Sequence, residues 1–458
     1  MFKLDYKHIR YLLLVIAILL VLFLIYKYFH PTPTILNVKD FGAKGDGISD
    51  DTRSIQTALD AGTKKKLSIY FPAGTYIVNA NDTLMIKSNT RMVGDGLNSV
   101  IKADKSKFAW SLFYISGSNI QINQIQFDGN NTVNRVVVIQ PGSSKVQISN
   151  SLVSNASQSD DKSSDFYSSI VAGILIYGNT YSIAIDQTEI QNVVSLHQLD
   201  GSLIARGIYI TTTPGASEKS STNLSIQNTT IHDIGPADDG DGIYYEDPLL
   251  NKNIIQNTNS TIKNNTFYNC AKRAIKLYAN GIEVTGNHIL NNYLNNNYYQ
   301  GKDKGKLAPD MYAGISVYGN NIKVANNVLE GRGSFYSGIE ITSSQTVRNI
   351  EVSANTITMG TQSKKIGTTS IRVGNIEDFS ISSNILENGE RGIWNWQNAT
   401  RGTITENIIH MPDGGGIDLT TYLPNFIQNN IRCSNNNITA KTFAIRTPEG
   451  NSSIYLNS

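Results

Sequence analysis

Gly173-Ile174-Leu175-Ile176 is the stretch that decides the fold, because its pattern recurs along the rest of the chain. A small residue comes first, an Ile second and, in most copies, another apolar residue fourth. The nine later copies are Gly207-Ile208-Tyr209-Ile210, Gly242-Ile243-Tyr244-Tyr245, Ala274-Ile275-Lys276-Leu277, Gly314-Ile315-Ser316-Val317, Gly338-Ile339-Glu340-Ile341, Ser370-Ile371-Arg372-Val373, Gly392-Ile393-Trp394-Asn395, Gly416-Ile417-Asp418-Leu419 and Ala444-Ile445-Arg446-Thr447. Successive copies start between 22 residues (370 to 392) and 40 residues (274 to 314) apart. Such spacing is typical of a repeat architecture, in which neighbouring repeats bury a shared core.

A second pattern lies between these copies. It consists of an Ile or Val, an Asn three residues later, and an apolar residue two positions after the Asn, as in Val284, Asn287 and Ile289. The segments are too short and too rich in β-branched residues for amphipathic helices. Asn tolerates left-handed backbone geometry at a bend, and stacked Asn side chains can form amide ladders. The sequence therefore predicts an all-β fold, a right-handed parallel β-helix with Asn at its bends.

The first part of this β-helix is predicted to carry a cap, because the exposed strand edges of a solenoid end need covering. Asp50 and Asp51 are expected to cap a helix that runs from about Thr52 to Ala61. Residues 66–78 then predict a strand, a Pro-Ala-Gly turn and a second strand. The side of the helix expected to be buried carries Ile55, Ala58 and Leu59.

Two segments of this region carry a family resemblance. VKDFGAKGDGISDDTRSIQTAL at 38–59 and IYFPAGTYIV at 69–78 resemble the start of the pectate-lyase-superfamily, rhamnogalacturonase/epimerase-like β-helix proteins. The resemblance implies this fold and an action on polysaccharides, in a group that includes lyases, glycosidases, epimerases and phage tailspikes. It also implies a structural role, and not a metal site, for Asp46, Asp50 and Asp51.

The N-terminus predicts a membrane anchor. Residues 11–29 are almost entirely apolar, and a run of this length spans a bilayer as a helix. The basic residues Lys3, Lys7 and Arg10 precede it, which places the N-terminus in the cytoplasm. We therefore expect a single-pass protein whose β-helix faces outward. The predicted parts are a cytoplasmic tail (1–10), a transmembrane helix (11–29), a linker (30–35), an N-terminal cap of the β-helix (36–100) and the β-helix proper (101–458).

Composition excludes one class of partner. Lys and Arg number 39 and Asp and Glu 37, a net charge of +2, so nothing in the bulk charge favours nucleic acid. Cys270 and Cys433 are too few and too far apart for a disulfide framework and are interpreted as small core residues.

The third and fifth positions of the recurring pattern predict a binding face. Alternate side chains of a strand point to opposite sides, so these positions face outward if the second and fourth face the core. Aromatic rings beside charged groups suit a sugar chain, which offers apolar ring faces and many hydroxyls. The predicted substrate-binding residues are Tyr209, Tyr244, Tyr278, Tyr318, Glu340, Arg372, Trp394 and Trp396.

The acidic segment 238–247 and the next repeat contain the candidate catalytic residues. These are Asp239, Asp241, Glu246, Arg273 and Lys276. In β-elimination, Arg273 or Lys276 would remove a proton from a uronic acid, and Asp238, Asp239 and Asp241 would hold Ca²⁺. In hydrolysis, Asp241 and Glu246, with Asp239 nearby, would flank the scissile bond. The sequence leaves both reactions open.

Several family motifs are missing. The Asn-Thr-Asp and Gly-His-Gly motifs of polygalacturonase-type hydrolases are absent, as is the Asp-Pro-His signature of mannuronan epimerases. His197 and His232 are interpreted as loop or surface residues. We expect a membrane-anchored, extracytoplasmic enzyme that cleaves an acidic polysaccharide by β-elimination or hydrolysis. The alternative is a non-catalytic carbohydrate-binding or cell-envelope scaffold protein.

Overall fold

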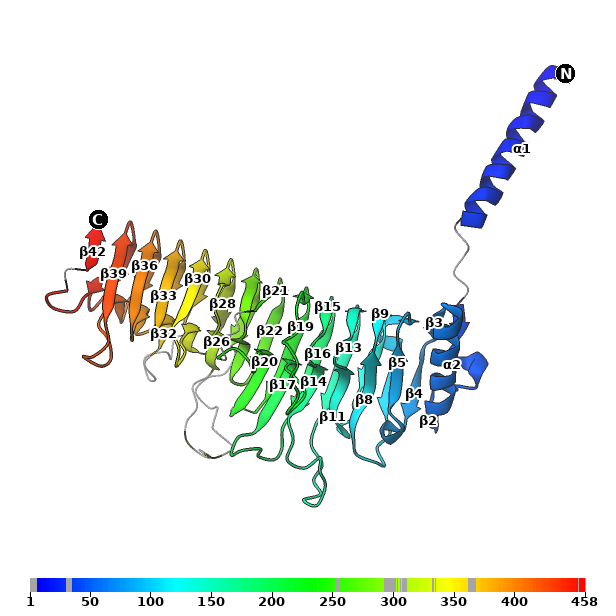
Figure 1. The fold of residues 1–458 in the computed structure, drawn as a ribbon, viewed down its shortest axis with the longest axis horizontal. Coiled ribbons are helices and arrows are strands. Elements are labelled where there is room, and N and C mark those ends of the chain that lie inside the picture. Colours follow the sequence, from blue (N-terminus) through cyan, green and yellow to red (C-terminus); the bar gives the residue numbers. More distant parts are fainter. Residues whose placement is uncertain are drawn as a thin grey trace.

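The chain winds as a right-handed parallel β-helix whose coils follow one another along the long axis of the molecule (Figure 1). This computed structural model describes residues 6–29, 35–236, 238–251, 256–291, 302, 304, 306, 311–331, 333, 335–360, 368–451 and 453–457. Most coils contribute one strand to each of three parallel sheets, since each sheet takes about every third strand of the chain. The predicted all-β solenoid is therefore confirmed.

Two of the three sheets contain none of the Gly-Ile copies. The 15-stranded sheet contains β1 (Ile35–Asn37), β3 (Ser68–Phe71), β6 (Arg91–Gly94), β9 (Ser118–Asn123), β12 (Ser144–Ser149), β15 (Tyr181–Asp186), β18 (Ser225–Gln227), β21 (Asn257–Lys263), β24 (Asn280–Thr285), β27 (Ile322–Ala325), β30 (Val347–Ser353), β33 (Ile376–Ser382), β36 (Ala399–Thr405), β39 (Gln428–Ser434) and β42 (Ile454–Asn457). The 14-stranded sheet contains β2 (Asp46–Asp50), β4 (Gly74–Val78), β7 (Ser99–Ala103), β10 (Gln126–Asp128), β13 (Leu152–Ala156), β16 (Glu189–Val194), β19 (Thr230–Gly235), β22 (Thr266–Cys270), β25 (His288–Asn291), β28 (Val328–Gly331), β31 (Thr356–Thr358), β34 (Ile385–Glu387), β37 (Ile408–Met411) and β40 (Asn437–Ala440).

The third sheet is built from the recurring pattern. All ten copies fall on consecutive strands of a 13-stranded sheet, and their second-position Ile residues pair in register from Ile174 to Ile445. Its strands are β5 (Leu84–Lys87), β8 (Ala109–Ser116), β11 (Val133–Ile139), β14 (Val171–Ile176), β17 (Ile204–Ile210), β20 (Asp239–Glu246), β23 (Arg273–Tyr278), β26 (Met311–Val317), β29 (Phe335–Ile341), β32 (Thr369–Val373), β35 (Arg391–Asn395), β38 (Gly415–Asp418) and β41 (Ile445–Arg446).

The first position of the pattern takes a small residue because the packing there is close. A Cβ on Gly207 would lie 2.4 Å from the carbonyl oxygen of Gly242 on the next strand and 2.7 Å from Ile231 Cγ2 in the core. The Gly therefore faces inward, next to the inward-facing Ile at the second position. Two consecutive inward positions interrupt the strict alternation of the strand, so the residue before each Gly points outward.

The predicted Asn ladder is present at the bends. Asn327 donates from its main-chain N (3.0 Å) and its Nδ2 (2.9 Å) to Asn355 Oδ1, and its own Oδ1 accepts the equivalent bonds from Asn287. The ladder runs through Asn265, Asn287, Asn327, Asn355, Asn384, Asn407 and Asn436. The expectation of left-handed geometry at these Asn residues is wrong, because the preceding residue adopts it, as Asn326 does (φ 56°).

The N-terminal cap forms largely as expected. Helix α2 spans Thr52–Lys65, four residues longer than predicted, and buries Ile55, Ala58 and Leu59. Asp51 does not cap it, since its carboxylate accepts from the main-chain N of Lys44 (2.7 Å) and Gly45 (3.0 Å). Short 3₁₀ helices complete this region: η1 (Val38–Phe41), η2 (Ala80–Asp82) and η3 (Gly96–Asn98).

Helix α1 (Tyr6–Phe29) lies beyond the end of the coil that carries α2 (Figure 1). In the part of the chain that the structure describes, no helix is long and apolar enough to cross a membrane. The described side chains of α1 are those of residues 10, 11 and 13–22 only. The anchor stays a prediction. Cys270 and Cys433 are both free and buried, as expected for core residues.

The amide ladder yields a prediction on stability. We expect Asn327→Ala to lower the free energy of unfolding by about 2 kcal/mol or more, because it leaves buried donors and acceptors of Asn287 and Asn355 without partners. Denaturant unfolding followed by circular dichroism measures this change. Asn429→Ala, at an exposed Asn of β39, serves as the control and should change little. Equal losses in both variants would contradict a structural role of the ladder.

Candidate active site on the 13-stranded sheet

The outer face of the 13-stranded sheet carries the predicted columns. In the third-position column, Tyr244 on β20 pairs with Lys276 on β23, and Glu340 on β29 pairs with Arg372 on β32. This face is more covered than expected, with Glu340 1% and Arg372 5% exposed. Side chains on neighbouring strands stand about 4.8 Å apart and cover one another.

Four charged side chains form a cluster on this face, which we call the arginine–aspartate cluster: Arg206, Asp239, Asp241 and Arg273. Asp241 Oδ2 lies 3.1 Å from Arg206 Nη1, and Asp241 Oδ1 lies 3.4 Å from Arg273 Nη1. Asp239 pairs with both arginines, at 3.4 Å from Arg273 and more closely with Arg206. Burial alone would raise the pKa of Asp239, but Arg206 and then Lys276 outweigh it and hold that pKa well below its usual range. Both carboxylates are thus held in ion pairs.

This cluster changes the roles expected of the acidic segment. Asp241 is 0% exposed, so in this conformation a polymer on the surface does not reach it. The predicted Ca²⁺ site at Asp238, Asp239 and Asp241 does not fit either. Among the described residues no group of three or more His, Cys, Asp or Glu side chains is placed to hold a metal ion. The oxygens of Asp239 and Asp241 are directed to guanidinium groups instead of converging on one point.

Lys276 lies beside this cluster and is only half-buried. Its Nζ is 4.1 Å from the centre of the Tyr244 ring. Burial lowers the pKa of Lys276, and the carboxylates of Asp241 and Asp239 oppose that shift without cancelling it. A lysine with a lowered pKa is the kind of group that removes a proton from a substrate near neutral pH.

Glu246, the last residue of β20, is held by three hydroxyl donors. Its carboxylate accepts from Tyr209 Oη (2.6 Å), Thr211 Oγ1 (2.9 Å) and Tyr244 Oη (3.2 Å). The Tyr209 and Tyr244 rings stack with centres 5.4 Å apart. Burial first and Glu246 next raise the pKa of both phenols, so both stay protonated. The stacked rings form an aromatic platform next to Lys276.

The neighbouring strands carry a second buried ion pair. Glu340 pairs with Arg372, as predicted from their positions, and Tyr312 Oη contacts both side chains at 3.1 Å. Arg273 Nε also donates to Ser316 Oγ (3.1 Å), which in turn donates to Glu340 (3.2 Å). Ser316 therefore connects the arginine–aspartate cluster to the Glu340–Arg372 pair by hydrogen bonds, and this network fixes the positions of these side chains.

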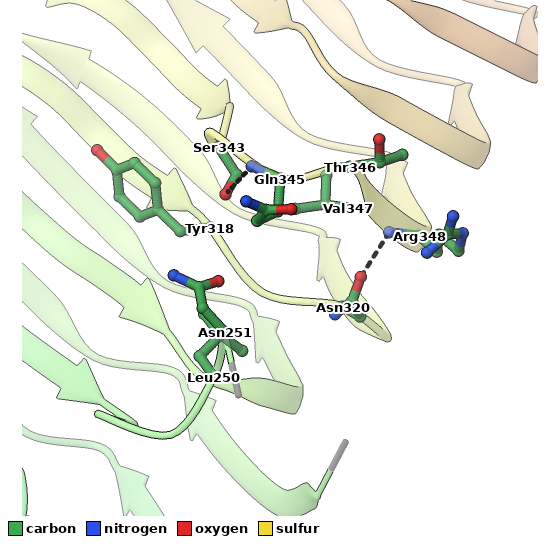
Figure 2. A pocket seen from close by; sticks show the side chains of 9 residues that line it. All are labelled: Leu250, Asn251, Tyr318, Asn320, Ser343, Gln345, Thr346, Val347 and Arg348. Atoms are coloured by element: carbon green, nitrogen blue, oxygen red, sulfur yellow. Dashed lines mark hydrogen bonds between the residues drawn. The ribbon is translucent and has the colours of Figure 1, made fainter. Parts of the chain in front are cut away.

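The remaining predicted aromatic residues lie further along the face. Tyr278 and Tyr318 have ring centres 6.1 Å apart, and Trp394 and Trp396 have ring centres 6.2 Å apart. Tyr318 also lines a pocket of about 320 Å³ beside the sheet. Figure 2 shows two hydrogen bonds within this lining, from Gln345 N to Ser343 Oγ (3.2 Å) and from Arg348 N to Asn320 Oδ1 (2.8 Å).

Arg206 and Tyr312 were not found from the sequence. Arg206 precedes Gly207, and strict alternation places that position toward the core. Because Gly207 faces inward, Arg206 points to the outer face. The residues before the first position of the pattern thus form a third outer column. His232 also differs from expectation: it lies on β19, is 5% exposed and contacts Glu189 (3.0 Å) and Asp233 (2.7 Å).

The arginine–aspartate cluster yields a second prediction. Asp241→Asn removes the charge between two buried arginines, so we expect the free energy of unfolding to fall by about 3 kcal/mol. Chemical denaturation measures it. Asp60→Asn, which breaks an exposed ion pair with Lys87, is the matched control and should lower the free energy of unfolding only slightly. An Asp241→Asn variant as stable as the parent chain would contradict the buried pairing.

Comparison with known proteins gives local sequence relatives. A 107-residue segment is 40% identical to mannuronan C5-epimerase AlgE2 of Azotobacter vinelandii and covers 20% of this chain and 11% of that protein. A 71-residue segment is 48% identical to alginate lyase 7 of the same organism and covers 14% and 8%. An 81-residue segment is 46% identical to a probable glucan endo-1,3-beta-glucosidase of Arthroderma benhamiae and covers 15% and 9%. The matched segments thus span only a small part of each relative.

Solved structures agree on the fold. PfbA, a surface adhesin of Streptococcus pneumoniae, aligns with a TM-score of 0.61 and 21% identity over 86% of this chain and 93% of that one. The catalytic unit of a GH87 alpha-1,3-glucanase of Streptomyces thermodiastaticus aligns with a TM-score of 0.56 and 13% identity, over 93% and 70%. Residues 35–303, more than half of the chain, match the family described as rhamnogalacturonase A/epimerase, pectate lyase-like. The resemblance predicted from the sequence is confirmed, and the chain belongs to the rhamnogalacturonase A/epimerase, pectate lyase-like family.

Proposed function

We propose that this protein acts on an acidic polysaccharide and cleaves it by β-elimination, with Lys276 as the base. The observation that carries the proposal is the half-buried Lys276, whose pKa is lowered, beside the aromatic platform of Tyr209 and Tyr244. The local sequence relatives, whose names include a mannuronan epimerase and an alginate lyase, support an acidic polymer as the substrate class.

The charges of the site favour proton removal over hydrolysis. Hydrolysis needs two carboxyl groups on either side of the scissile bond. Here Asp241 and Glu340 are buried in ion pairs, and Glu246 is occupied by three hydroxyl donors. The groups nearest to Lys276 carry a net charge of +1 when Lys276 is protonated, because Arg206, Arg273 and Lys276 face Asp239 and Asp241. This excess positive charge is present once Lys276 has taken the proton, and it stabilises the anion that forms on the uronate.

In the proposed reaction, Lys276 acts on one uronate of the polymer. The neutral amine of Lys276 takes the proton from C5 of a uronate, next to its carboxylate. The electron pair left on C5 forms a double bond to C4, and the C4–O bond to the leaving sugar breaks. The leaving oxygen takes a proton from water, and the hydroxide that remains takes the proton from Lys276, which restores the neutral amine. Products are an unsaturated uronate and a new hydroxyl end.

Lys276→Ala tests the base. We expect at least about a hundredfold loss in the rate of unsaturated-product absorbance on a panel of uronate polymers, since a positioned base contributes about 10²–10⁴-fold. In the parent chain the rate should rise with pH through a pKa below that of an ordinary lysine, because only the neutral amine accepts a proton. Lys323→Ala, at a half-exposed ion pair with Glu351 on another sheet, is the control.

Other outcomes separate the alternatives. New reducing ends without absorbance would support hydrolysis and overturn the proposal. Binding of a polymer without any product would support a non-catalytic binding protein. A Lys276→Ala variant as active as the parent would show that another group is the base.

We also propose that residues 11–29 anchor the protein in a membrane, with the β-helix on the outer side. The apolar run and the basic residues before it support this proposal. Fractionation of cells that express the full chain, beside a chain starting at residue 35, tests it. We expect only the full chain in the membrane fraction, and recovery of both in the soluble fraction would contradict the anchor.

A further inference from the structure

Arg135 on β11 is an arginine of the outer face with no acidic partner. The column of residues before the first position of the pattern runs through Ala172, Arg206, Asp241 and Arg273 on successive strands. Arg135 lies in register with Ala172 on β11, where Val136 stands at the place of the small residue. Arg206 and Arg273 are both paired with Asp239 and Asp241. Within the described residues, Arg135 forms no ion pair, and the small Ala172 separates it from the arginine–aspartate cluster.

The surroundings of Arg135 are aromatic. Its guanidinium carbon lies 4.7 Å from the centre of the Trp110 ring on β8. Tyr177, Tyr114 and Tyr209 are the titratable side chains that act on its pKa, and none of them is a carboxylate. Burial lowers the pKa of Arg135, although the guanidinium stays protonated at any physiological pH. A half-buried guanidinium without a counter-charge has lost part of its hydration, and an anionic ligand offsets that cost.

A pocket is present at this point. It has a volume of about 100 Å³, and its lining includes Arg135, Tyr177, Tyr209 and Thr211. Tyr209 and Thr211 already donate their hydroxyl protons to Glu246. Arg135 is therefore the group in the lining that offers charge-assisted donors to a ligand, and its planar fork matches a carboxylate.

We propose that the Arg135 pocket is a subsite that binds the carboxylate of an acidic sugar, four strands away from Lys276. Four strand spacings amount to about 19 Å, so the same chain of sugars reaches both places when it lies across the strands. The inference rests on the proposed function only for the class of ligand. It concerns binding and does not depend on which reaction follows.

Calorimetric titration of the full chain tests this subsite. The probes are short oligomers of galacturonate, mannuronate and guluronate and their carboxyl-reduced, neutral counterparts, and every variant carries Lys276→Ala so that no oligomer is consumed. We expect Arg135→Gln to weaken binding of the acidic oligomers by roughly tenfold or more, the effect of one lost charge-assisted hydrogen bond. Binding of neutral oligomers should not change.

Two further variants control the test. Arg135→Lys keeps the charge but loses the fork, so its affinity should lie between those of the parent and Arg135→Gln; it also serves if the Gln variant does not fold. Arg432→Gln removes an exposed arginine of β39 and should bind like the parent. Unchanged affinity in Arg135→Gln, equal binding of acidic and neutral oligomers, or no binding of any acidic oligomer would overturn the subsite. Activity of the parent chain is measured separately, so failure of the lyase proposal is distinguishable from failure of the subsite.

Discussion

The contact on which the structure depends is the close approach of one coil to the next at the small first residue of each repeat, which is Gly in seven of the ten copies. At Gly207 and Gly242 the main chain of the following strand comes so near that a side chain would collide with its carbonyl oxygen. That approach keeps the inward Ile column in register over ten strands. It also turns the preceding residue outward, and Arg206, Asp241 and Arg273 lie at this position; Arg135 is in register with them on β11. The packing requirement of the core thus fixes the position of the charged groups on the surface.

A parallel coil then places like positions of successive repeats about 4.8 Å apart. At this spacing the charges along a column must alternate in sign or pair with a further group of opposite charge, because like charges on neighbouring strands repel. The sequence Arg206, Asp241, Arg273 along one column alternates in sign, and Asp239 supplies the second carboxylate. Among the described residues of this face, neither Lys276 nor Arg135 forms an ion pair. Both lie beside tyrosine rings, so that a positive charge and a flat surface occur together, as the proposed acidic sugar requires.

The fold was predictable from the sequence because its determinants are local and repeated. The Gly-Ile pattern, the bend Asn residues and helix α2 each recur or carry their own signals within a few residues. The pairings of Asp241 with Arg273 and of Tyr244 with Lys276 follow from the same register. Arg206 and Arg135 were missed because strict strand alternation predicts no outer column at their position. Asp241 and Arg273 share that position and were found through the acidic segment 238–247 and the repeat that follows it. Burial of Asp241 was missed because it depends on long side chains from three strands that close over it.

The measurement that tests the central claim most directly is a crystal structure of the Lys276→Ala chain with a bound acidic oligosaccharide. We expect the sugar chain to cross the outer face of the 13-stranded sheet between β11 and β23. One carboxylate should contact Arg135, and one C5 should lie over the position of the Lys276 amine. An oligosaccharide bound to either of the other two sheets, or along a single strand of this one, would contradict the claim.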